Sequence, residues 1–298
     1  MILGSTPPKL SYIGPHKEDL QSPSQMGSFI DLLTLIDNNL TLNFQLDILN
    51  TCIDVSNISF TPNFYKEIID EESEEASDLL NKINAHLTRT GSKIFFYLGK
   101  DYFLGTQIEN VEKETVALIT KLSEILETIG VNYPCILLRI GSAYGNRKST
   151  LKTFCERTKK LGKSTISRLC VMNDDKPSLF SVTDLLSGVY YETGIPICFR
   201  ILSHQFNDGG LSIREALFLS CSTWKPGHKP VFIHAEPRDV DEFGFPIESK
   251  ASDYLHHRIP TFGLDLDIII DSPAKEDACL KYRMEHRSLP PIVINKRN

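Results

Sequence analysis

Short apolar runs alternate with longer amphipathic segments along almost the whole chain. In the amphipathic segments, apolar residues recur at helical spacing, as Val116, Ile119, Leu122 and Leu126 do in the clearest case. Ser181, and Ser212 together with Glu215, are predicted to cap the helices that they begin. The predicted strands are 9–14, 40–48, 93–98, 134–140, 166–172, 195–201, 230–234 and 264–271. The predicted helices are 29–36, 70–87, 111–129, 149–161, 181–192, 212–222 and 274–285.

This alternation predicts an α/β fold with a parallel sheet. Strands that are apolar throughout are typical of sheets covered on both faces. About eight strand–helix units in 298 residues favour a single (β/α)8 TIM-type barrel over residues 1–298, with 1–8 and 288–298 as tails. An open doubly wound sheet is the alternative, but no glycine-rich phosphate loop follows the first strand.

Composition indicates an ordinary intracellular protein. The net charge is −6, which argues against tight DNA binding in the absence of a local basic patch. None of the seven cysteines forms a C-x-x-C pair, and Cys135, Cys170 and Cys198 lie in apolar runs, as small buried residues in a reducing compartment do. No apolar stretch is long enough for a membrane span and the N-terminus lacks a signal peptide pattern, so we expect a soluble, intracellular protein.

Chemistry in such barrels lies at the carboxyl ends of the strands. A hydrolytic metal cluster would need His, Asp and Glu side chains there. Arginine, which has no lone pair to donate, stands at two of these ends. The residues at the predicted strand ends are Tyr97, Arg139, Met172, Asn173, Asp174, Arg200, His234 and Asp271.

Six segments, in order along nearly the whole chain, carry a resemblance to a known family. They are KLSY (9–12), IGSAYGNRKSTLKTF (140–154), LCVMNDD (169–175), GIPICFRILSHQF (194–206), STWKPGHKPVFIHAE (222–236) and LDIIIDSPAKEDACL (266–280). Together they resemble the motifs of the UV damage endonuclease family. The resemblance implies a barrel similar to endonuclease IV, with a cluster of divalent metals that nicks DNA on the 5′ side of photoproducts and abasic sites.

The resemblance also implies that most of the family's site residues are replaced in this chain. His234 and Asp271 are the metal ligands that it leaves, and no histidine stands where the family has one after its second strand. The replaced positions are Tyr97, Arg139, Met172, Arg200, Ser203, Phe232, Ala251 and Pro273. The matching positions are Tyr12, Asn173, Asp174, His204 and Lys275.

Several interpretations follow for the barrel mouth. We expect Arg139 and Arg200 to pair with Asp174, Asp271 or both, as a salt-bridged plug. The family's damage-probing Gln and aromatic residue fall on Lys100 and Asp101, with Tyr102 one residue away. We interpret the acidic stretch 236–242 as a solvated loop that opposes a DNA backbone.

Two further features have plain structural interpretations. Trp224 is expected to be a structural anchor before the seventh strand. The adjacent His256 and His257 are not expected to bind one metal together, because neighbouring side chains point in different directions.

Three function classes are compatible with these residues. The lost ligands favour a divergent family member with little or no activity, needing no cofactor. The alternative is an active repair endonuclease with a reduced Mn or Zn site, and a third class is an unrelated small-molecule enzyme such as an isomerase. The binding partner is either DNA, bound weakly, or another protein. No membrane partner is expected.

Overall fold

The computed structural model describes residues 9–12, 51–54, 80–81, 83–85, 87–89, 91–99 and 101–286. For residues 9–12, 51–54 and Glu276 it describes the backbone alone. The predicted helix at 29–36 and the predicted strand at 40–48 lie outside these residues. Residues 80–81, 83–85 and 87–89 are helical, in agreement with the end of the helix predicted at 70–87.

Eight parallel strands form one sheet in the order β1-β8-β7-β6-β5-β4-β3-β2. β1 and β2, at the two ends of this order, lie beside each other, so the eight strands curl round into a barrel. The predicted TIM-type barrel is therefore confirmed. The strands are β1 (Lys9–Tyr12), β2 (Thr51–Asp54), β3 (Ile94–Tyr97), β4 (Ile136–Leu138), β5 (Leu169–Met172), β6 (Ile197–Arg200), β7 (Val231–His234) and β8 (Asp267–Ile270).

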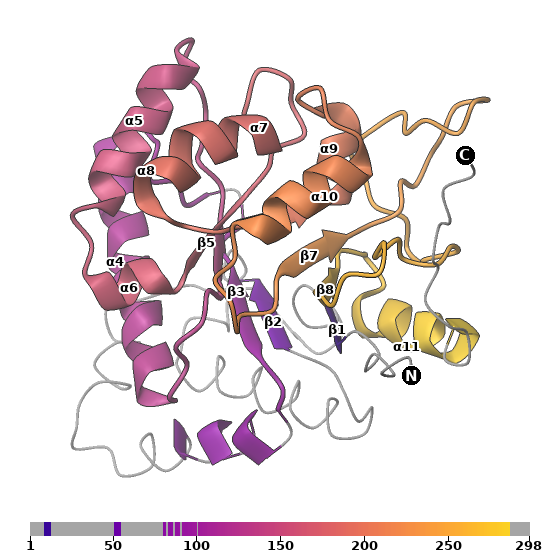
Figure 1. Cartoon of the computed structure of the whole chain (residues 1–298), viewed down its shortest axis with the longest axis horizontal. Helices are drawn as coiled ribbons and strands as arrows, with labels where there is room; N and C mark the ends of the chain where they lie inside the picture. The colour runs from indigo at the N-terminus through magenta and orange to yellow at the C-terminus, as the bar shows by residue number, and fades with distance from the viewer. Residues whose placement is uncertain are drawn as a thin grey trace.

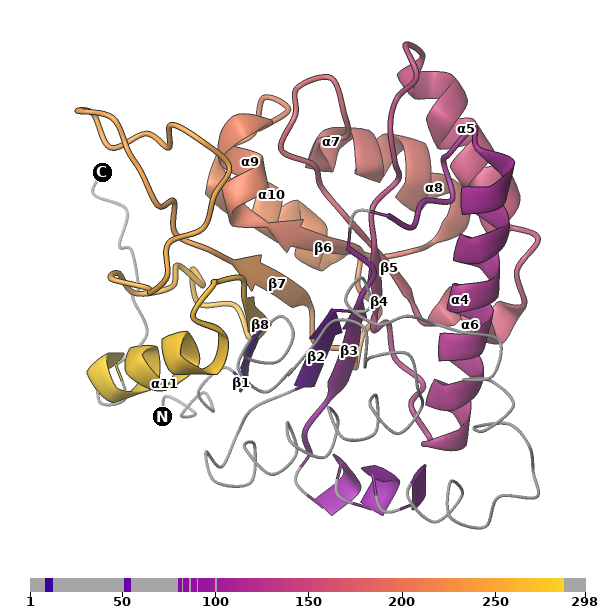
Figure 2. The ribbon, with the colours of Figure 1, turned by 180° about the vertical axis from the view of Figure 1, so that it is seen from behind.

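Helices surround this sheet on the outside (Figure 1). In both views α4 and α6 lie on one flank and α11 lies on the opposite flank (Figure 2). The helices are α4 (Glu109–Thr128), α5 (Arg147–Thr158), α6 (Lys163–Ser167), α7 (Val182–Leu185), the π-helical η4 (Leu186–Tyr190), α8 (Tyr191–Thr193), α9 (Ile201–Phe206), α10 (Ile213–Ser222) and α11 (Lys275–His286). No described helix is long and apolar enough to cross a membrane.

The periodic apolar residues form the core between sheet and helices. In α4, Leu118, Ile119, Leu122 and Leu126 are buried, as their spacing predicts. Every residue of β3, β4, β5, β7 and β8 is buried. Complete burial of one such aliphatic side chain contributes about 1.5–3 kcal/mol, so this inner layer holds the strand ends in place.

The predicted helix starts at Ser181 and Ser212 are confirmed as reciprocal capping boxes. The Ser212 hydroxyl accepts a hydrogen bond from the Glu215 amide, and the Glu215 carboxylate accepts one from the Ser212 amide. Ser181 and Asp184 form the same pair at the start of α7. A cap of this kind contributes about 1 kcal/mol to its helix.

Several strand boundaries differ from the predicted ones. No strand was predicted at Thr51–Asp54, which pairs in register with β3. The predicted strand at 166–172 begins at Leu169, because α6 continues through Ser167.

Candidate functional site

The end of β6 presents Arg200 to the barrel mouth. Its backbone is held by Asn173, whose side-chain oxygen accepts from the Arg200 amide at 2.8 Å and whose side-chain nitrogen donates to the Arg200 carbonyl at 3.1 Å. The guanidinium donates from Nη2 to Oδ2 of Asp271 at 3.2 Å and lies 6.0 Å from the centre of the Tyr97 ring. Asn173 thus holds the backbone of Arg200 in place. The predicted pairing of Arg200 with Asp271 is confirmed.

Arg139, just after β4, makes the second predicted ion pair. Its Nε lies 3.8 Å from Oδ1 of Asp174, and its Nη2 donates to the Tyr97 hydroxyl at 3.3 Å. Asp174 is buried, and burial raises the pKa of its carboxyl to about 6 against the opposing effects of Arg139 and Arg200. The two arginines therefore flank Tyr97, and each holds a different carboxylate.

His234, the last residue of β7, is buried beneath the mouth. Its ring lies edge-on to Phe232, with 5.6 Å between the ring centres. Neither ring nitrogen has a hydrogen-bond partner among the described residues. Burial lowers the pKa of His234 to about 4, so the imidazole is neutral at physiological pH.

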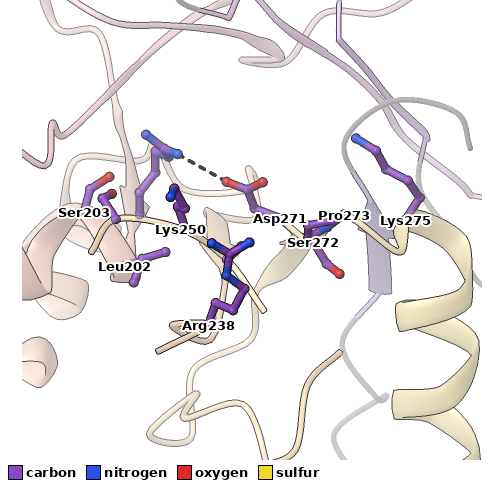
Figure 3. A pocket seen from close by; sticks show the side chains of 11 residues that line it. Leu202, Ser203, Arg238, Lys250, Asp271, Ser272, Pro273 and Lys275 are labelled. Atoms are coloured by element: carbon purple, nitrogen blue, oxygen red, sulfur yellow. Dashed lines mark hydrogen bonds and ion pairs between the residues drawn. The ribbon is translucent and has the colours of Figure 1, made fainter. Parts of the chain in front are cut away.

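A pocket of about 390 Å³ opens beside the Arg200–Asp271 pair (Figure 3). Its walls come from the start of α9, the segment after β7 and the segment after β8, which meet at the carboxyl ends of these strands. In Figure 3, Arg238 extends toward the space between Lys250 and Asp271. The lining residues are Arg200, Leu202, Ser203, Arg238, Ser249, Lys250, Ala251, Asp271, Ser272, Pro273 and Lys275.

The pocket brings together several of the predicted site residues. Ser203, Ala251, Pro273 and Lys275 line it together with Arg200 and Asp271. Met172 and Phe232 do not line it and are buried in the core, where Phe232 stacks on Phe199 at 5.7 Å.

Two further residues match the family motifs, and the structure places only one of them fully. His204 is buried on α9 and its Nε2 is 3.0 Å from the Leu211 carbonyl oxygen, a contact that ties α9 to the segment before α10. Tyr12 ends β1 in register with Ile270, and its side chain lies outside the description.

Sequence reasoning missed three residues around the mouth and misinterpreted a fourth. Arg238 and Lys250 line the pocket but lie in an irregular segment that carries no strand or helix pattern. Asp54 ends β2 in register with Tyr97, and no strand was predicted at this segment. Glu236 is a structural tether, because its carboxylate accepts hydrogen bonds from the amides of His256 and His257 at 3.0 and 2.7 Å.

The interpretation of 236–242 as a solvated loop is therefore wrong for its first residue, Glu236. The side chain of Glu236 is only 12% exposed. Both histidines contact Glu236 through their backbone amides, and the Nδ1 of His257 also lies 3.3 Å from Glu236 Oε2. Trp224 is the predicted anchor: it is buried and its Nε1 donates to the Ile197 carbonyl at 2.8 Å. Tyr102 is half-buried and Asp101 exposed, while Lys100 lies outside the described residues.

Comparison with known proteins identifies the family to which the chain belongs. Residues 63–293 match the family described as UV-endonuclease UvdE. The putative UV-damage endonuclease of Acanthamoeba polyphaga mimivirus is 21% identical over 230 residues, which cover 75% of this chain and 69% of the viral protein.

Two crystal structures resemble the barrel. SacUVDE has a TM-score of 0.73 at 22% identity, covering 95% of this chain and all of that one. Endonuclease IV from Thermus thermophilus has a TM-score of 0.60 at 13% identity, covering 93% and 97%. At these identities the two structures support the fold, and the family match extends over most of the sequence. The chain belongs to the UV-endonuclease UvdE family.

Proposed function

We propose that this chain is a non-catalytic member of its family, in which ion pairs have replaced a metal cluster at the barrel mouth. The observation that carries the proposal is the contact between Arg200 and Asp271 at 3.2 Å. Asp271 is one of the two ligands that the family resemblance leaves, and its Oδ2 already accepts a hydrogen bond from a permanent cation.

The described side chains at the mouth do not offer the ligand set of a cluster of divalent metals. Among the residues that the structure describes, no three His, Cys, Asp or Glu side chains are grouped to hold a metal ion. A guanidinium about 5 Å from a dication also costs several kcal/mol at a moderate effective dielectric. Arg139 and Arg200 both introduce this charge, and the buried Asp174 is already 3.8 Å from Arg139.

Phosphodiester hydrolysis by metals requires an activated water and a cation on the leaving oxygen. Neither arginine can generate that nucleophile, because a guanidinium stays protonated and has no lone pair. We therefore expect the chain not to cleave DNA.

The second candidate is an active nuclease with a reduced metal site. The observation that favours it is His234, whose two ring nitrogens have no described hydrogen-bond partner and which burial keeps neutral, as a metal ligand must be. In that case Mn or Zn would be the cofactor, and Asp271 would have to leave Arg200 in order to bind it.

A nicking assay separates the two candidates. The full chain is incubated with irradiated, abasic and undamaged duplex DNA in excess Mn and Mg, beside an active UV DNA damage endonuclease. We expect no cleavage above background on any duplex. Cleavage of damaged DNA that disappears in both His234→Ala and Asp271→Ala would contradict the proposal and establish the reduced metal site.

A further inference from the structure

The segment after β7 forms an arm with an apolar tip. This arm, residues 237–251, is closed at its base by an antiparallel bridge between Pro237 and Ala251. A few scattered apolar side chains are normal on a protein surface, whereas a group of them indicates a contact surface. The large apolar side chains that the arm exposes are Val240 (48%), Phe243 (76%), Phe245 (67%) and Ile247 (63%).

Hydrogen bonds hold the tip of the arm in one conformation. The amide of Asp241 donates to the Phe245 carbonyl at 2.8 Å. The Asp241 carboxylate accepts from the amides of Phe243 and Phe245 at 2.9 and 2.8 Å. Little conformational entropy is therefore lost when the two aromatic rings meet a partner.

The arm has an excess of negative charge. Its two bases are neutralised by two of its four acids, in ion pairs of 2.7 to 3.3 Å that join Arg238 and Lys250 to Asp239 and Glu248. The other two acids are Asp241 and Glu242, which leave the arm with a charge of −2. A surface that covers this tip therefore needs positive charge next to apolar groups.

A surface of this kind lies where α5 ends and α6 begins. Lys160 and Lys163 are exposed there, and neither has an ion-pair partner among the described residues. Lys159 is paired with Glu192 of α8 at 3.1 Å, and Tyr191, the neighbour of Glu192, is 73% exposed. We call Tyr191 and the three lysines the basic face. Three lysines against Glu192 give it a charge of +2.

Nearby acids do not cancel the charge of the basic face. Glu127 is paired with the buried Arg168 at 3.6 Å, and Glu156 is paired with Lys152 at 3.8 Å. Each of these acids thus has a base of its own. The charges of the arm and the basic face are therefore equal and opposite, and both surfaces expose aromatic side chains.

The arm and the basic face lie on opposite sides of the barrel. In Figure 1 and Figure 2 the segment between β7 and β8 extends away from the barrel on the side opposite to α6. One chain therefore cannot bring its arm onto its own basic face. We infer that the arm docks on the basic face of a second copy of this chain, with its aromatic tip against Tyr191 and its acids near Lys160 and Lys163.

The proposed contact joins two different surfaces, so it is head-to-tail and builds rings or open chains. A contact between two arms is disfavoured, because each arm carries −2. Burial of one aromatic side chain removes roughly 150–250 Å² of surface, whereas a stable interface takes about 800 Å² from each partner. The assembly is therefore weak and dissociates on dilution. It involves a surface outside the Arg200–Asp271 pair and does not depend on the proposed function.

Sedimentation velocity of the full chain over the micromolar to millimolar range tests this inference. We expect assembly that grows with concentration and weakens in molar salt, which screens the charges. The arm variant, Phe243→Ser with Phe245→Ser, and the face variant, Lys160→Glu with Lys163→Glu, should each weaken self-association at least about tenfold. An equimolar mixture of the two variants should form a dimer and nothing larger, because one variant has an intact face and the other an intact arm.

The matched controls change exposed side chains outside both surfaces. They are Phe218→Ser, and Lys148→Glu with Lys225→Glu. Both should associate like the parent, and a melting curve of each variant establishes that it is folded. A parent chain that stays monomeric over the whole range, or a mixture of arm and face variants without a dimer, would overturn the inference. Self-association that is lost in the arm variant but kept in the face variant would also overturn it, because the arm would then contact another surface.

Discussion

Asn173 and Arg200 are joined by two hydrogen bonds, because the Asn173 side chain accepts from the Arg200 amide and donates to the Arg200 carbonyl. This contact links the end of β5 to the end of β6 and fixes the backbone from which the guanidinium reaches Asp271. Asn173 is one of the residues that match the family motif, whereas Arg200 is one that departs from it. A retained residue therefore holds a replaced one in place.

Removal of the Arg200 side chain is expected to destabilise the barrel. Arg200→Ala should lower the free energy of unfolding by about 1–3 kcal/mol, less than the 3–5 kcal/mol of a fully buried pair, because the Asp271 side chain is 33% exposed. A double-mutant cycle with Asp271→Ala, measured by urea unfolding, should give a coupling energy of at least about 0.5 kcal/mol.

The exposed pair of Lys113 and Glu109 supplies the control for this cycle. Lys113→Ala should change stability by less than about 0.5 kcal/mol. If Arg200→Ala melts like the parent protein, the arginine is solvated and the mouth is not closed by this pair.

Asp174 should make stability fall as the pH rises from about 4 to about 6. Burial raises the pKa of its carboxyl to about 6 in the folded chain, whereas the unfolded chain ionises it near 4. The folded state thus binds more protons between these values, and its stability decreases as the pH rises through them. Relative to Asp174→Asn, the parent should lose roughly 2 kcal/mol over this window in urea unfolding. Equal pH slopes would mean that Asp174 titrates normally.

His234 should have the opposite effect. Burial lowers its pKa to about 4, below the value of about 6.5 in the unfolded chain. Below pH 6.5 the unfolded state therefore binds the extra proton, and stability is lost as the pH falls toward 4. Compared with His234→Gln, the parent should lose about 2 kcal/mol between pH 7 and pH 5. An NMR titration that placed the imidazole pKa near 6.5 would refute the burial of this ring.

Loss of the Glu236 tether should release the segment around His256 and His257. Glu236→Ala removes the acceptor of both amides, so their hydrogen exchange should accelerate and the unfolding free energy should fall by about 1–3 kcal/mol. Glu242→Ala, which removes an exposed acid from the same segment, should change neither quantity measurably. Similar exchange in the two variants would show that the tether is dispensable.

Much of the barrel could be predicted because burial imposes simple patterns on it. The apolar runs that became β3 to β8 are buried on both faces, and the serines before α7 and α10 form the caps that their spacing predicts. β2 was missed because TCID offers only two apolar residues, too few for a strand pattern. Its pairing in register with β3 is a tertiary effect that the local sequence does not reveal.

The site was harder to predict than the fold. The partners of Arg139 and Arg200 could be expected, because their strand ends meet Asp174 and Asp271 at one mouth of the barrel. Lys250 and Arg238 could not be placed, because their segment has no period and its path depends on contacts such as the Arg238–Glu248 pair. A motif match can also point to a residue outside the pocket. His204 matches the family motif, but it contacts the Leu211 backbone and does not line the pocket.

The metal content of the purified chain tests the central claim most directly. Elemental analysis after exhaustive dialysis, without chelator, counts the transition-metal ions that remain per protein chain. Because Asp271 is paired with Arg200 and a second arginine lies at the mouth, we predict less than one tightly bound ion per chain. Two or more Zn or Mn ions per chain, lost in His234→Ala and Asp271→Ala, would contradict the account.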